Sequence, residues 1–110
     1  MFGIFKNRKA EKNQADRDLI AANSGAVEAL VILAYNDELK AQLKDIKEEI
    51  KYIIPLVADK AYTMDKKISG IIGDLKIELT KYDGEEKSSV KIGNMIRDLK
   101  VAIAERKALI

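Results

Sequence analysis

A helical stripe from Leu39 to Tyr82 constrains the fold of this chain most, because apolar or small residues recur through it at steps of three and four. This spacing places side chains on one face of an α-helix. The stripe consists of Leu39, Leu43, Ile46, Ile50, Ile53, Val57, Ala61, Met64, Ile68, Ile71 or Ile72, Leu75, Leu79 and Tyr82. It predicts a long helical segment with one interruption, at Pro55.

Pro55 lacks a backbone donor, and its ring clashes with the preceding helical turn. It either kinks a continuous helix or ends one helix at Ile54 and begins another. The flanking residues offer no Gly, Asn, Asp or Ser with which to build a reversing loop. We therefore expect a kink at Pro55, with a break as the alternative.

The amino-acid composition excludes disorder and several kinds of catalytic and metal-binding site. The chain has 47% hydrophobic residues, which is too many for a disordered chain, and one proline and six glycines in 110 residues, which is typical of a helical protein. It has neither cysteine nor histidine, so disulfides, thiolate or imidazole metal sites and Ser-His-Asp triads cannot form within it. We predict no enzymatic activity, no metal and no cofactor. The absence of cysteine also fits a cytoplasmic protein.

The fold class predicted is all-α, a single domain over residues 1–110. We expect a short basic helix over 10–22, a break at Asn23-Ser24-Gly25, a long helix over 26–82 and a return helix over 88–109. Tyr82-Asp83-Gly84 is the clearest turn signal. The result is an antiparallel helical bundle containing an αα-hairpin, with the long helix kinked or broken near Pro55.

The first half of the stripe lacks a partner of equal length within the chain. Either a sharp break near Pro55 closes a three- or four-helix bundle, or a second chain covers this half. We predict a homo-oligomer, with a dimer favoured or a helical partner in its place, and an interface within residues 27–53. The predicted interface residues are Leu30, Leu33, Leu39, Leu43, Ile46, Ile50 and Ile53.

Residues 1–9 form a predicted flexible arm in which an apolar tip precedes a basic run. It is too short to bury much apolar area, so we expect a frayed end or a tip docked on its own bundle. The alternative is a contact with an anionic membrane surface. The residues of that contact would be Phe2, Phe5, Lys6, Arg8, Lys9 and Lys12.

Several residues of the later helices have simple interpretations. Arg106 lies on the apolar stripe of the return helix, and we expect its charged group to bend out to water. Asp65 and Asp74 are nine residues apart, on opposite faces of one helix, and predict no site. Ser69-Gly70 and Gly73 are interpreted as small residues that admit close approach of a neighbouring helix.

The function predicted is that of a non-enzymatic interaction or structural protein, acting through self-association or a partner helix. The alternative is a peripheral membrane-associated adaptor that uses the N-terminal arm. Nucleic-acid binding is disfavoured, because acidic residues are interleaved with the cations and no basic stripe forms. A transmembrane span over 19–35 is disfavoured, because the stretch is short and holds polar residues.

Overall fold

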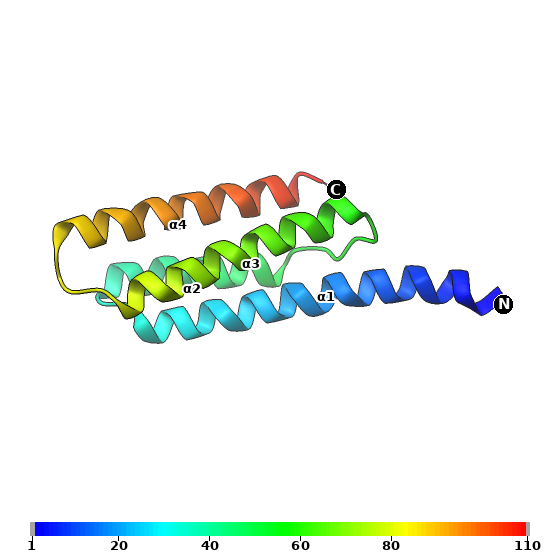
Figure 1. The fold of residues 1–110 in the computed structure, drawn as a ribbon, viewed down its shortest axis with the longest axis horizontal. Coiled ribbons are helices and arrows are strands. Elements are labelled where there is room, and N and C mark those ends of the chain that lie inside the picture. Colours follow the sequence, from blue (N-terminus) through cyan, green and yellow to red (C-terminus); the bar gives the residue numbers. More distant parts are fainter. Residues whose placement is uncertain (1, 110) are drawn as a thin grey trace.

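A computed structural model describes the backbone of residues 2–109 and the side chains of residues 13–109. This part of the chain contains four α-helices, and helices that follow one another in sequence run in opposite directions (Figure 1). The helices are α1 (Phe2–Leu33), α2 (Asp37–Lys51), α3 (Asp59–Thr80) and α4 (Glu86–Lys107). The prediction of an all-α antiparallel bundle is confirmed.

The helices enclose one core, to which all four contribute. α1 packs against both α2 and α3, and α4 packs mainly against α3. α2 and α3 lie diagonally across the bundle, and no Cα atom of one is within 8 Å of a Cα atom of the other. The segment 52–58 therefore crosses the end of the bundle to join two helices that are not neighbours. The centre of the core is made of side chains that are 1% exposed or less, among them Val27, Leu30, Leu43, Ile46, Ile50, Ile68, Leu75, Ile92, Leu99 and Ile103.

The prediction of a break at Asn23-Ser24-Gly25 is wrong, because α1 runs through these residues and the chain reverses at 34–36 instead. Asn36 is the N-cap of α2, and its side-chain oxygen accepts the Leu39 N–H at 2.8 Å. Such a cap stabilises a helix start by about 1 kcal/mol. Glycine within a helix costs a similar amount, so Gly25 alone could not end α1.

The kink predicted at Pro55 is also wrong, and the alternative of a break is what the structure has. α2 ends at Lys51 and α3 begins at Asp59, so Pro55 lies in the connection. No turn-forming residue is needed there, because side chains from α1 and α4 bind the backbone of this connection. Those partners lie forty or more residues away in sequence, so local rules could not reveal them.

The turn between α3 and α4 lies where the sequence predicts it. Gly84 has φ of +86°, in the left-handed region that glycine occupies most readily. The Asp83 carboxylate accepts the Glu85 N–H at 3.0 Å and the Ser88 hydroxyl at 3.2 Å. Nearby, the rings of Tyr35 and Tyr82 stack at 3.9 Å between centroids. The predicted αα-hairpin of the last two helices is confirmed.

The close helix approach predicted at Gly70 and Gly73 is wrong. A Cβ atom added at either glycine would meet no atom within 4 Å. Both residues lie on the exposed side of α3, while Ile68, Ile72 and Leu75 face the core. The two glycines are therefore not needed for packing.

Candidate functional site

The structure buries three charged side chains together at the end of the bundle where α1 begins. Asp16 of α1, Asp65 of α3 and Arg106 of α4 are each 0% exposed. The Arg106 Nε–H donates to both carboxylate oxygens of Asp65 at 3.1 Å, and Arg106 Nη2 donates to Asp16 Oδ2 at 3.0 Å. One guanidinium thus joins three helices.

The same cluster holds the connection 52–58. Arg106 Nη2 donates to the Ile54 carbonyl oxygen at 2.8 Å, and Asp16 Oδ2 accepts the Leu56 N–H at 2.8 Å. These two bonds flank Pro55, whose ring nitrogen has no hydrogen to donate. Both hydrogen bonds are partly buried, and the cluster supplies the backbone partners that a helix or turn would otherwise supply.

Two carboxyl groups share a single cation in this cluster. Burial raises the pKa of Asp65 to about 7, the neighbouring Asp16 carboxyl group adds to the rise, and Arg106 opposes it. Two buried carboxyl groups beside a single cation are more stable when one of them carries a proton. Two buried polar atoms of the cluster, Asp16 Oδ1 and Arg106 Nη1, have no hydrogen-bond partner among the described residues.

Sequence reasoning missed this cluster. The expectation that Arg106 would reach water is wrong, because two aspartates and a carbonyl oxygen bind its guanidinium inside the bundle. Asp65 was set aside with Asp74, although it alone of the two is buried. A signal was present: Asp16 is four residues before Ile20, Asp65 four after Ala61 and Arg106 three after Ile103. Charges of opposite sign at core positions of three helices indicate a buried network.

The end of the bundle that contains this cluster also exposes apolar side chains. The first turns of α1 extend beyond the ends of the other three helices there (Figure 1). Along the connection and into α3, Tyr52 is 70% exposed, Ile54 52%, Val57 42% and Tyr62 39%. Among the described residues, the other large apolar side chains with high exposure are Ile32 on α1, Ile77 on α3, and Val90 and Val101 on α4.

Charge is divided unevenly along the bundle. The half with the connection 52–58 comprises residues 2–22, 46–67 and 96–109, and holds fourteen Lys or Arg against nine Asp or Glu. The other half holds six Lys or Arg against nine Asp or Glu. Two lysines lie beside the exposed tyrosines, Lys51 Nζ at 5.9 Å from the Tyr52 ring centre and Lys66 Nζ at 5.7 Å from that of Tyr62. We call the half with the connection the basic end.

The residues predicted to form an intermolecular interface lie in this chain's own core. Six of them are buried and Leu33 is partly buried against the core: Leu30, Leu33, Leu39, Leu43, Ile46, Ile50 and Ile53. The prediction assumed that this half of the stripe had no internal partner. That assumption fails because the chain reverses twice, which brings α1 and α4 against α2. Self-association itself stays a prediction.

The predicted N-terminal contact falls largely outside what the structure describes. The side chains of Phe2, Phe5, Lys6, Arg8, Lys9 and Lys12 lie outside the described residues. Their backbone is helical and belongs to α1. The helix therefore carries this stretch of the sequence outward from the basic end (Figure 1).

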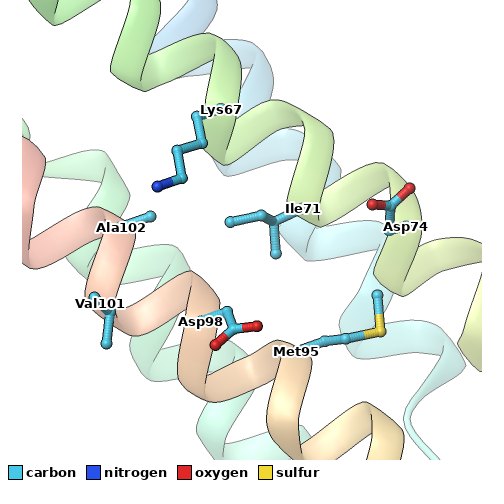
Figure 2. A pocket seen from close by; sticks show the side chains of 7 residues that line it. All are labelled: Lys67, Ile71, Asp74, Met95, Asp98, Val101 and Ala102. Atoms are coloured by element: carbon cyan, nitrogen blue, oxygen red, sulfur yellow. The ribbon is translucent and has the colours of Figure 1, made fainter.

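The surface also has shallow grooves between helices. One groove, of about 390 Å³, lies between α3 and α4. Figure 2 shows the side chains that line it, among them the apolar Ile71 and Met95 and the acidic Asp74 and Asp98. A second, of about 340 Å³, lies at the basic end between Ala15, Leu56 and Tyr62. The first groove has the character of an ordinary helix seam, while the second continues the exposed apolar surface.

The described residues contain neither a candidate metal site nor a helix that could span a membrane. Within the described side chains, no three Asp, Glu, His or Cys residues lie close enough together to hold a metal ion. No helix in that part of the chain combines the length and the apolar character that crossing a membrane requires. No protein-family model matches this chain, and no curated protein or solved structure is found to be similar to it.

Proposed function

We propose that this protein is a non-enzymatic interaction module that binds peripherally to an anionic membrane surface through its basic end. One observation carries the proposal: exposed apolar side chains, an excess of cations and the projecting start of α1 all lie at the same end. Peripheral membrane contacts combine these features, because apolar groups enter the interface while cations meet acidic lipid headgroups.

The strength of the apolar contribution can be estimated from the connection alone. Ile54 and Val57 are half exposed, and full burial of such a side chain is worth about 1.5–3 kcal/mol. Tyr52 and Tyr62 add amphipathic rings, which favour the headgroup region. The free energy from these apolar and aromatic side chains is too small to hold the protein on a membrane without an electrostatic contribution.

Basic side chains supply the rest of the free energy of membrane binding. A Lys or Arg near an anionic surface contributes about 1 kcal/mol, and Lys51 and Lys66 lie beside the exposed rings. Arg17 and Lys60 are exposed at the same end. The backbone of the start of α1 projects from the same end, and the sequence of that stretch contains Phe2, Phe5 and several basic residues. The excess of like charge also disfavours pairing of two basic ends with each other, which favours lipid over a second copy as the occupant.

The proposal places the protein at the inner, cytoplasmic side of a membrane, because acidic lipids are found in that leaflet. A chain without cysteine has no disulfide to lose in the reducing conditions there. No catalytic step is part of it. The buried aspartates are enclosed by Arg106 and the connection, so they lack access to a substrate.

Co-sedimentation with vesicles tests this function. We expect the full chain to pellet with phosphatidylcholine vesicles that contain phosphatidylglycerol, to remain free with pure phosphatidylcholine, and to be released by salt. The double variant Ile54→Ser, Val57→Ser should reduce binding. A matched control, Ile77→Ser with Val90→Ser, changes similarly exposed residues of the other half and should bind as the unmodified chain does. Equal binding by both variants, or none by the unmodified chain, would refute the proposal.

Self-association remains a second candidate, favoured by the start of α1, which extends past the neighbouring helices. An isolated helical segment of this length is marginal in water and gains stability from a partner. Light scattering after gel filtration measures the mass directly, and a strict monomer at high concentration would end this candidate.

A further inference from the structure

The connection 52–58 depends on charged side chains for its position. The Ile54 carbonyl oxygen and the Leu56 N–H bond to Arg106 and Asp16, respectively, on either side of Pro55. Both of these side chains belong to the cluster in which two carboxyl groups meet one guanidinium. The protonation of that cluster and the position of the connection are therefore linked physically.

We infer that Asp16 and Asp65 share one bound proton over Arg106, and that this proton fastens the connection 52–58 to the bundle. With the proton present, one neutral carboxyl group and one carboxylate balance one guanidinium. Without it, two buried carboxylates lie beside a single cation, and one negative charge has no partner. Burial makes such a charge costly, so opening toward water becomes more favourable.

The charged groups that face Asp65 are few. Asp16 faces it from α1 and Arg106 from α4. α1 also presents Asn23, whose uncharged amide donates to the Asp65 carbonyl oxygen at 3.0 Å. The connection presents backbone groups, and α2 lies diagonally across the bundle from α3, with no Cα atom within 8 Å of one in α3. No further charge contributes to the rise in the pKa of Asp65.

The sign of the pH effect follows from this pKa. In an open state the carboxyl group of Asp65 has the ordinary value of about 3.9, while in the closed bundle its pKa is about 7. The closed state therefore binds the proton more tightly. Raising the pH from about 4 to 7 favours opening, and above about pH 7 both states have lost the proton, so the effect levels off.

Hydrogen exchange of single amides in the full chain tests the inference. The Leu56 amide reports on the connection, since its N–H donates to Asp16. After division by the intrinsic exchange rate, its protection factor should fall by about tenfold or more between pH 5 and pH 7 and change little above pH 8. The Leu39 amide is the matched internal control, since it donates to the Asn36 side chain in the other half. Its protection should not follow this curve.

Two variants separate the proton from the general stability of the bundle. Asp65→Asn and Asp16→Asn each replace a carboxyl group by an uncharged amide, and in either variant the pH dependence at Leu56 should disappear. The inference is overturned if Leu56 protection in the unmodified chain is constant from pH 5 to pH 8. It is overturned equally if Leu39 changes in parallel, because that result reports global unfolding. The measurement needs no membrane, so its outcome is independent of the proposed function.

Discussion

At the scale of single residues, Arg106 determines how the basic end closes. Its guanidinium is fully buried and bonds to side chains from two helices and to the backbone of the connection. Buried ion pairs often add little net stability compared with apolar residues, because desolvation offsets the attraction. Their geometric demand is strict, however. Its hydrogen bonds need α1, α3 and the connection in place at the same time, so we expect the cluster to favour this arrangement over other packings.

Arg106→Met tests this role. The substitution leaves two carboxyl groups without their cation, and loss of one partner from a buried pair costs about 3–5 kcal/mol. The free energy of unfolding from urea denaturation at pH 7 should fall by that amount. Arg97→Met is the matched control, because Arg97 has a side chain that is 70% exposed. It should change the stability by less than about 0.5 kcal/mol. A loss below about 1 kcal/mol for Arg106→Met would contradict the role.

At the scale of helices, the sequence predicts which segments are helical more accurately than it predicts where each helix begins and ends. The turn at Gly84 could be found because its signal is local: Asp-Gly between two periodic stretches. Asn36 was a local signal too, followed by Asp37 and Glu38 in the first turn of α2, but the long apolar stripe obscured it. The break at Pro55 could not be found from its neighbours, because Asp16 and Arg106 stabilise it from a distance.

A pair of glycine substitutions tests the assignment of turn and helix. Gly84 has a positive φ, so Gly84→Ala should destabilise the bundle by about 1 kcal/mol, although a Cβ has open space there. Gly70 lies within α3 with equal space around it, so Gly70→Ala should stabilise by about 1 kcal/mol. Thermal unfolding followed by circular dichroism measures both. Shifts of the same sign would show that one of the two backbone assignments is wrong.

At the scale of the whole molecule, the two ends of the bundle differ in charge and in exposed surface. The N-terminal arm could be proposed as a contact from its Phe and Lys residues alone. That Ile54 and Val57 lie exposed at the same end could not be predicted, because the sequence pattern places both in a helix that continues past Pro55. Likewise, the stripe from Leu30 to Ile53 resembled an interface until the chain reversals supplied its internal partners. The fold class can thus be predicted from sequence periodicity, while the candidate surface becomes visible only in the tertiary structure.

Spin labels at two valines test the central claim, that the basic end meets the membrane, most directly. The chain has no cysteine, so Val57→Cys and Val90→Cys each provide a single labelling site. The two residues are similarly exposed, at 42% and 55%, and lie in opposite halves. On vesicles containing phosphatidylglycerol, we predict that the label at position 57 becomes accessible to oxygen and shielded from a water-soluble nickel complex, while the label at 90 remains in water. Two labels that both stay in water, or burial of the label at 90 alone, would contradict the account.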